Sequence, residues 1–131
     1  MDIKDLILVI IGLICGFFLF YRFPKPKKVN RPSQKRVSVV IPCRNEQLNI
    51  GELLQNLKAQ TIKPFEIICV NDQSQDDTAK IIKQFPNVRL VDILDCPKDW
   101  KGKPFALTEG AKAAKGDIIL FLDADVKLKK D

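Results

Sequence analysis

Apolar and polar residues alternate in blocks along most of this 131-residue chain. Short apolar runs rich in β-branched residues are typical of buried strands. Such runs recur here, bounded by proline, asparagine, aspartate or glycine. They predict four strands, at residues 37–41, 65–70, 88–93 and 118–122.

The segments between these runs have the spacing of amphipathic helices. The apolar residues of 50–57 recur at i, i+3, i+4 and i+7, which predicts a helix that ends near residue 60. A second helix is predicted over 79–85, with Ser74 and Asp77 at the spacing of a capping box. A third is predicted over 104–114, with a slim face of small residues for close packing, namely Ala106, Gly110, Ala113 and Ala114. Strands alternating with helices predict an α/β fold, Rossmann-like, with a mostly parallel sheet and flanking helices.

The first 21 residues differ from this pattern. Leu6 to Tyr21 is an uncharged run of 16 residues. As a helix it reaches about 24 Å, against a hydrocarbon core of about 30 Å, unless Lys4 and Arg22 snorkel and extend it. A signal peptide fits less well because acids outnumber bases ahead of the run, and a buried core helix because the run has no polar face. We therefore predict one transmembrane anchor over residues 1–21.

The net charge of +6 comes from one segment of the chain. Residues 22–36 form a proline-rich linker with seven basic and no acidic side chains, whereas residues 37–131 carry 14 of each sign. Basic residues beside a membrane span favour the cytoplasmic side. We therefore predict a single-pass protein of the cell membrane, with its N-terminus outside and residues 37–131 in the cytoplasm. The linker is expected to attract anionic lipids, and nucleic-acid binding is not expected.

Composition narrows the chemistry that is available. The absence of histidine excludes a Ser-His-Asp triad, a histidine base and most zinc sites. A hydrophobic content of 46% excludes a disordered chain. The four cysteines show no C-x-x-C spacing, so we expect reduced thiols rather than disulfides.

Polar residues follow three of the predicted strands. They are Arg44, Asn45 and Glu46 after the first, Asn71 and Asp72 after the second, and Asp123 and Asp125 after the fourth. Ligands of parallel sheets bind beyond the carboxyl ends of the strands, so we expect these residues to share one site. Asp123 and Asp125 can face one ligand because alternate side chains of an extended segment point the same way. Two carboxylates suit Mg²⁺ or Mn²⁺ shared with phosphates, and a solvated turn is the alternative.

Two further residues admit both a structural and a binding role. Asp72 is placed either to cap the next helix or to accept N–H groups from a base. Lys103 is either solvated or a partner for an anionic diphosphate. The chain has neither a G-x-G-x-x-G motif nor a P-loop, which favours a metal-bridged nucleoside diphosphate.

Together these features resemble the nucleotide-binding half of a family 2 glycosyltransferase with the GT-A fold. The matching segments are VSVVIPCRNEQLNIGELLQNL, EIICVNDQSQDDT and WKGKPFALTEGAKAAKGDIILFLDADV, which cover about residues 37–127. Within the family, the W-x-G-K-x-x-A segment before F-x-D-A-D-V is most similar to membrane-linked bacterial members that act on isoprenoid or other lipid acceptors. The resemblance implies a nucleotide-sugar donor, most simply a UDP-sugar, and a lipid or membrane-proximal acceptor.

The resemblance also implies roles for residues of the nucleotide pocket. Pro42, Arg44 and Glu46 would line the nucleoside pocket, with Glu46 near the ribose. Asp72 would receive the uracil N3–H. Lys103 would lie near the base or the diphosphate.

The D-x-D residues would serve the diphosphate end. Asp123 would contact the ribose or the metal, and Asp125 would ligate the Mn²⁺ or Mg²⁺ ion that bridges the diphosphate. The chain departs from the family pattern at Cys43, where a small or aromatic residue is usual, and at Gln73, where glycine is usual.

The resemblance assigns no catalytic base to this chain. In the family the base comes from the acceptor half, and only VKLKKD follows Asp125. We therefore expect residues 37–131 to be an incomplete GT-A region that does not transfer sugar alone, with a fourth strand whose exposed side lowers solubility. The alternative is an inactive nucleotide-sugar-binding module that pairs with or regulates a partner chain. A nucleotidyltransferase is disfavoured because no glycine follows the first strand in residues 42–46.

Overall fold

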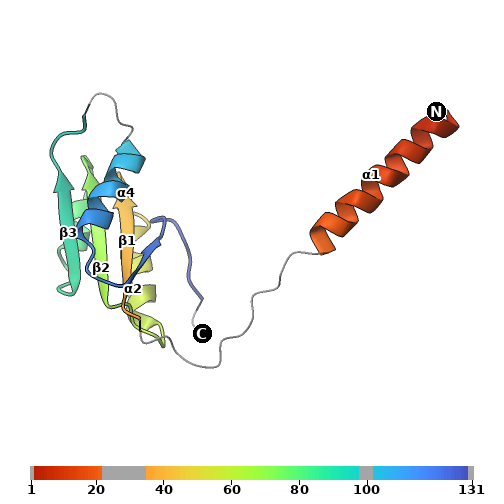
Figure 1. Cartoon of the computed structure of the whole chain (residues 1–131). Coiled ribbons are helices and arrows are strands. Elements are labelled where there is room, and N and C mark those ends of the chain that lie inside the picture. Colours follow the sequence, from red (N-terminus) through yellow and green to blue (C-terminus); the bar gives the residue numbers. More distant parts are fainter. Residues whose placement is uncertain (1, 22–34, 98–101, 130–131) are drawn as a thin grey trace. The chain divides into compact units, whose positions relative to one another are not determined.

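The computed structural model describes residues 2–21, 35–97 and 102–129. The chain divides into two compact units, residues 1–33 and residues 34–131. The first contains helix α1 (Ile3–Tyr21), and the second contains all the strands (Figure 1). The basic linker expected over 22–36 lies, apart from Lys35 and Arg36, outside the described residues.

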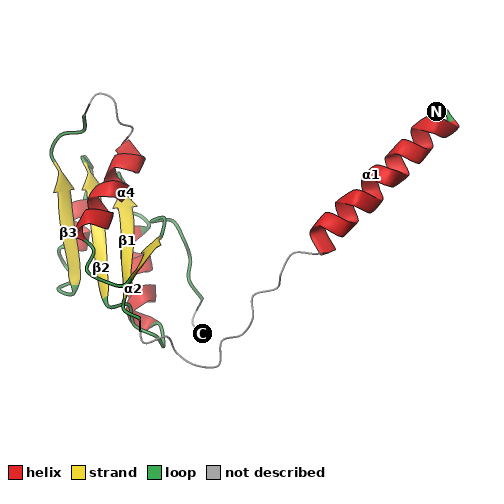
Figure 2. Ribbon diagram, viewed as in Figure 1, coloured by secondary structure: helices red, strands yellow, loops and turns green. Residues whose placement is uncertain are grey.

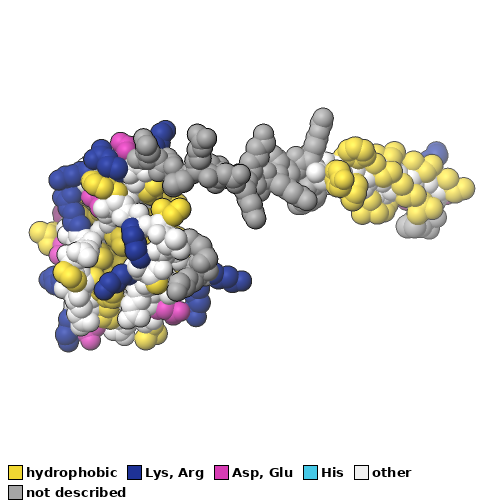
Figure 3. Space-filling view, turned by 90° about the horizontal axis from the view of Figure 1, so that it is seen from below, with side chains coloured by type: hydrophobic (Ala, Val, Ile, Leu, Met, Phe, Trp, Pro, Cys, Tyr) yellow, Lys and Arg dark blue, Asp and Glu magenta, His cyan; other side chains and the backbone are white. Residues whose placement is uncertain are grey.

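Helix α1 is apolar along most of its length. Its large side chains are exposed, and in Figure 3 they cover the visible face of the helix. In the described part of the chain, no helix combines the length and apolar character that crossing a bilayer requires. The predicted transmembrane helix is therefore not supported. The helix has 19 residues and carries Lys4 and Asp5 near its start, which shortens its uncharged part.

The second unit is built on a parallel sheet, as the alternation of strands and helices predicted. The strand order is β3-β2-β1-β4, and each neighbouring pair is parallel (Figure 2). The strands are β1 (Val37–Cys43), β2 (Glu66–Asp72), β3 (Val88–Ile93) and β4 (Ile118–Phe121). All four strands therefore end at the same edge of the sheet.

Helices cover both faces of this sheet (Figure 1). Helix α4 (Gly102–Ala113) packs on one face, and α2 (Ile50–Ala59) and α3 (Thr78–Ile82) lie on the other. Helix α3 is shorter than predicted and begins after an N-cap at Asp77 that makes no side-chain capping bond. The predicted capping box is wrong, because the Ser74 hydroxyl instead accepts the Asn45 backbone N–H at 3.1 Å.

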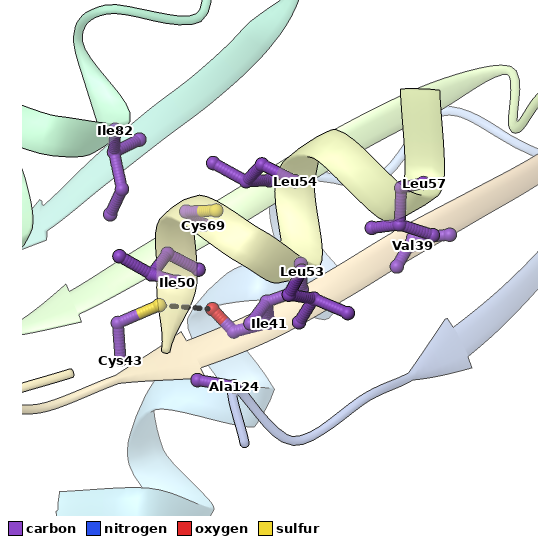
Figure 4. Packing of buried hydrophobic residues seen from close by; sticks show 10 residues of the cluster. All are labelled: Val39, Ile41, Cys43, Ile50, Leu53, Leu54, Leu57, Cys69, Ile82 and Ala124. Atoms are coloured by element: carbon purple, nitrogen blue, oxygen red, sulfur yellow. Dashed lines mark hydrogen bonds between the residues drawn. The ribbon is translucent and has the colours of Figure 1, made fainter. Parts of the chain in front are cut away.

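The core alternates between the two faces along β1. Val39, Ile41 and Cys43 point toward α2, where they meet its buried leucines, and the Cys43 thiol donates to the Ile41 carbonyl at 3.4 Å (Figure 4). Val40 packs on the other face with residues of α4 such as Ala106. This two-residue period is what buries a central strand on both sides.

Strand β1 continues through Pro42, although proline was expected to end it. Proline lacks a donor and is tolerated in a strand only where no ladder bond is lost. The Val40 carbonyl accepts the Leu122 N–H, so the backbone of Val40 faces the β4 side of the strand. The backbone nitrogen of Pro42, two residues further on, faces that same side. β4 has already ended at Phe121. Pro42 therefore has no ladder partner to lose.

Strand β4 forms one edge of the sheet and is poorly covered. Its four side chains, two on each face, are 38% to 48% exposed. An exposed apolar edge promotes association with other chains, so low solubility remains our expectation.

The small face of α4 gives a test of the packing. A Cβ on Gly110 would collide with Val40 Cγ1 and lie 3.0 Å from Val70 Cγ2, whereas a Cβ on Gly51 in α2 would meet Ile81 Cγ2 at an ordinary 3.5 Å. We expect Gly110→Ala to lower the free energy of unfolding by about 1–3 kcal/mol through overpacking. The matched variant Gly51→Ala should raise it by about 0.5–1 kcal/mol through helix propensity. Urea unfolding measures both, and equal effects would contradict the close approach of α4.

Candidate nucleotide-binding site

A cavity of about 390 Å³ lies at the carboxyl edge of the sheet. Every residue predicted from the sequence to bind nucleotide or metal lines it, namely Pro42, Arg44, Glu46, Asp72, Lys103, Asp123 and Asp125. The cavity is completed by small or buried residues that the sequence did not single out as binding, namely Cys43, Gly102, Ala106 and Ala124. The structure thus brings together residues up to 83 positions apart in the chain, from Pro42 to Asp125.

The strand ends explain why these residues meet. β1 ends at Cys43 and β2 at Asp72, and Asn45 and Gln73 follow with positive φ values of 56° and 53°. Such a left-handed residue costs roughly 1 kcal/mol when it is not glycine. Gln73 therefore adopts a left-handed conformation that glycine takes at least cost, and its side-chain amide donates to the Leu94 carbonyl at 3.3 Å.

Asp72 is the buried anion of the cavity. Its side chain is 6% exposed, and its Oδ2 lies 3.4 Å from Nη1 of Arg44, whose side chain is 63% exposed. A Cβ on Gly102, the first residue of α4, would collide with Asp72 Oδ2 and come within 3.3 Å of Arg44 Nη1. The start of α4 therefore lies directly against the carboxylate, and a larger residue at position 102 would displace the Asp72 side chain. The positive end of the helix dipole in turn favours the anion.

Lys103 and Asp123 form an ion pair at the mouth of the cavity. Lys103 Nζ lies 2.8 Å from Asp123 Oδ1, and both side chains are more than half exposed. The hydrogen bond and charge of Asp123 raise the pKa of Lys103, with smaller contributions from Asp125 and Glu46. Lys103 is thus a cation held among carboxylates, where an anionic ligand can reach it.

Asp123 and Asp125 fit the expected divalent metal. The two carboxylates line the same cavity, and the side chain of Asp123 is 55% exposed. Over the described residues, no group of three or more histidine, cysteine or acidic side chains is arranged to hold a metal ion. Two carboxylates with open positions suit Mg²⁺ or Mn²⁺ that is also bound by diphosphate oxygens and water. The metal site remains a prediction.

Cys43 lines the cavity as a thiol. A hydrogen bond with Cys69 and burial raise the pKa of Cys43 well above its ordinary range. The thiolate is the nucleophilic form of cysteine, so Cys43 is not a nucleophile at neutral pH. Cys43 and Cys69 are free thiols buried in the core, in keeping with the reduced thiols expected from the sequence.

Asp76 has a role that the sequence analysis missed. From its spacing alone, Asp76 is a first-turn acid that the dipole of the following helix would favour. In the structure it precedes α3, and its carboxylate accepts the N–H groups of Gln47 and Thr78 at 3.1 and 3.0 Å. The D-x-T spacing of Asp76 and Thr78 could have indicated this role, since aspartate commonly accepts the backbone N–H two residues further on.

Comparison with known proteins gives the class of the chain. Residues 38–131 match the model of the family described as glycosyl transferase family 2. The match covers more than half of the chain, so the chain belongs to glycosyl transferase family 2, and the GT-A resemblance is confirmed.

Particular relatives are similar to the chain over part of their length. The 4,4'-diaponeurosporenoate glycosyltransferase of Staphylococcus aureus (strain bovine RF122 / ET3-1) is 34% identical over 128 residues, which are 95% of this chain and 34% of that protein. S. aureus TarS 1–349 in complex with UDP superposes with a TM-score of 0.61 and 29% identity, over 69% of this chain and 27% of that one. Glucosyl-3-phosphoglycerate synthase from Mycobacterium tuberculosis, in complex with Mn²⁺, UDP and phosphoglyceric acid, superposes with a TM-score of 0.58 and 27% identity. The match covers 70% of this chain and 33% of that one. The chain therefore spans about a third of the length of the curated relatives it matches.

The ion pair between Lys103 and Asp123 predicts how the pKa of Lys103 changes when its partner is removed. Because Asp123 raises the pKa of Lys103, the folded pKa should exceed the ordinary lysine value of about 10.4. The ion pair then stabilises the folded chain fully below the ordinary lysine pKa. This stabilisation is lost as the pH rises through the folded pKa of Lys103. NMR titration of the lysine ¹³Cε resonances should show the Lys103 pKa falling in Asp123→Asn. It should not change in Glu109→Gln, which alters the equally short Lys112–Glu109 pair on α4. An unchanged pKa in Asp123→Asn would refute the pairing.

Proposed function

We propose that this chain binds a UDP-sugar and serves a glycosyltransferase that transfers the sugar to a lipid acceptor. The single observation that carries the proposal is the convergence of the two D-x-D carboxylates, Asp72 and two cations in one cavity. TarS and glucosyl-3-phosphoglycerate synthase, which share the fold at 25–29% identity, are known in complex with UDP. These likenesses support UDP as the nucleotide.

The inner part of the cavity suits the nucleoside. Asp72 is buried and accepts hydrogen bonds only, so it is suited to take the uracil N3–H. The exposed Arg44 guanidinium beside it can lie against the base, and Glu46 can accept from the ribose hydroxyls. Pro42 has no N–H to satisfy and forms part of the apolar wall.

The mouth of the cavity suits the diphosphate. Asp125 and Asp123 would hold Mn²⁺ or Mg²⁺, and glucosyl-3-phosphoglycerate synthase, of similar structure, is known with Mn²⁺. When bound, such an ion neutralises the charge that develops on a departing diphosphate. Lys103 then adds a second cation, since an exposed lysine is protonated at neutral pH.

A lipid acceptor and a location at the membrane complete the proposal. The name of the diaponeurosporenoate glycosyltransferase supports an apolar acceptor. Helix α1 exposes apolar side chains on all sides, and such a helix favours an apolar environment. The basic charge of residues 22–36 supports contact with the anionic cytoplasmic leaflet.

A second candidate is a nucleotide-sugar-binding module that works with another polypeptide. The acids that line the cavity are Glu46, Asp72, Asp123 and Asp125, and each has a proposed role toward the donor. None is left to deprotonate an acceptor hydroxyl in the described part of the cavity. Incubation of the chain with radiolabelled UDP-sugar and lipid acceptors separates the two, since turnover excludes the module.

Calorimetry with UDP and Mn²⁺ tests the nucleotide site. Asp72→Ala and Asp125→Ala should each weaken binding at least tenfold, because one removes the base acceptor and the other a metal ligand. Tenfold corresponds to about 1.4 kcal/mol. Glu109→Ala removes a half-buried α4 carboxylate outside the cavity, and this variant should bind as the unaltered chain does. Unchanged binding by both cavity variants would refute the assignment.

Vesicle flotation tests the membrane proposal. The full chain should float with phosphatidylglycerol vesicles, and the double variant Ile7→Glu/Ile14→Glu should not, because charges within α1 oppose lipid contact. The matched double variant Leu48→Glu/Leu94→Glu changes two highly exposed apolar residues of the second unit and should float. Flotation of the α1 variant would exclude α1 as the membrane contact.

A further inference from the structure

We propose that Thr78 is a positioning residue that joins the β1–α2 loop to the β2–α3 loop and thereby sets where Glu46 lies relative to Asp72 in the nucleotide cavity. This inference rests on the proposed UDP site. Neither the sequence pattern nor the family resemblance assigned Thr78 a part in it.

The Thr78 hydroxyl is buried and fully engaged. The residue has no exposed surface. Its Oγ1 accepts the backbone N–H of Glu46 at 2.8 Å and donates to Asp76 Oδ1 at 2.5 Å. One side chain at the start of α3 therefore holds the main chain at Glu46, which lies 32 residues earlier.

Asp76 fixes the direction of this bond. A carboxylate accepts hydrogen bonds only, so the hydroxyl proton must point to Asp76 and a lone pair must face the Glu46 N–H. Asp76 is itself held by the backbone N–H groups of Gln47 and Thr78. Burial opposes the ionised form, but these hydrogen bonds prevail and lower the pKa of Asp76, which remains an acceptor at neutral pH.

The rest of the two loops is joined in the same manner. The Asn45 side chain accepts the Gln75 N–H at 2.9 Å, and the Gln47 side chain accepts the Asp77 N–H at 3.2 Å. Ser74 accepts the Asn45 N–H in return. These residues are exposed or half-buried, whereas Thr78 is fully enclosed, so water cannot replace its hydroxyl.

The consequence for the cavity follows from where the loops begin. Asp72 ends β2 and starts the loop that leads to Thr78, and Asp72 and Glu46 both line the cavity. The Glu46 carboxylate accepts a hydrogen bond from Asn49 Nδ2 at 2.9 Å, within the same loop, so the carboxylate is expected to move with that loop. Small misplacements of binding groups cost large factors in affinity or rate. Loss of the hydroxyl should therefore weaken nucleotide binding without removing any group that touches the nucleotide.

A matched buried hydroxyl separates this role from a purely structural one. Ser38, near the start of β1, is also fully buried. It donates to Glu66 Oε1 at 2.6 Å and accepts the Gly116 N–H at 2.8 Å, but it does not line the cavity. Ser38→Ala thus removes the same kind of network at the opposite edge of the sheet.

The experiment compares Thr78→Val, Thr78→Ser and Ser38→Ala in the full chain. UDP affinity in the presence of Mn²⁺ should fall about tenfold in Thr78→Val and stay within twofold in Thr78→Ser, which keeps the hydroxyl. Ser38→Ala should stay within twofold although urea unfolding shows it to be destabilised. The Glu46 amide should be protected from hydrogen exchange in the unaltered chain and in Thr78→Ser, and should lose that protection in Thr78→Val.

A second pair of variants covers the case in which Thr78→Val does not fold. Asp76→Ala removes the acceptor that orients the hydroxyl and should weaken UDP binding three- to tenfold. Asp77→Ala, at the adjacent exposed acid that pairs with Lys80, should not. Unaltered affinity in Thr78→Val or in Asp76→Ala, or an equal loss in Ser38→Ala, overturns the positioning role alone. An unaltered chain that binds no UDP overturns the proposed function and the role with it.

Discussion

Strand β1 pairs in parallel with β2 on one side and with β4 on the other, and both the core and the cavity depend on this arrangement. Cys43 lies opposite Asn71, and Val40 lies opposite Phe121. Parallel strands bring their carboxyl ends to one edge. Asp72 and the D-x-D carboxylates therefore reach the same cavity, although about 50 residues separate them in the chain. Alternate residues of β1 are buried on opposite faces of the sheet, and this packing fixes the position of that edge.

The charge of the cavity explains why a divalent ion belongs to the proposed function. Four carboxylates line it, and its two cations are already engaged, Arg44 with Asp72 and Lys103 with Asp123. An anionic diphosphate would meet net repulsion in such a cavity. A divalent ion held by Asp123 and Asp125 would offset this excess of negative charge and leave Lys103 available to the phosphates. The Thr78 hydroxyl holds the main chain at Glu46, which lines the same cavity.

Much of the fold could be predicted from local pattern. The four strands and the helix over 50–59 were found within one or two residues of their observed bounds, because burial on defined faces leaves a clear period. Predictions were wrong where a contact with a distant part of the chain overrode the role that the local sequence suggested. Ser74 bonds to Asn45 rather than capping α3, and Pro42 stays in β1 because β4 ends before reaching it. The apolar length of α1 falls short of a membrane span.

The sequence by itself determined the elements, their parallel arrangement and the residue types that follow each strand, since these depend on spacing along one segment. The glycosyltransferase resemblance added roles for those residues. Only the tertiary structure decided which side chains meet, such as Lys103 with Asp123, Gly102 with Asp72 and Thr78 with Glu46. These contacts join segments 20 or more residues apart. Their geometry depends on strand register and on how closely α4 and the loops approach the sheet, which no local pattern encodes.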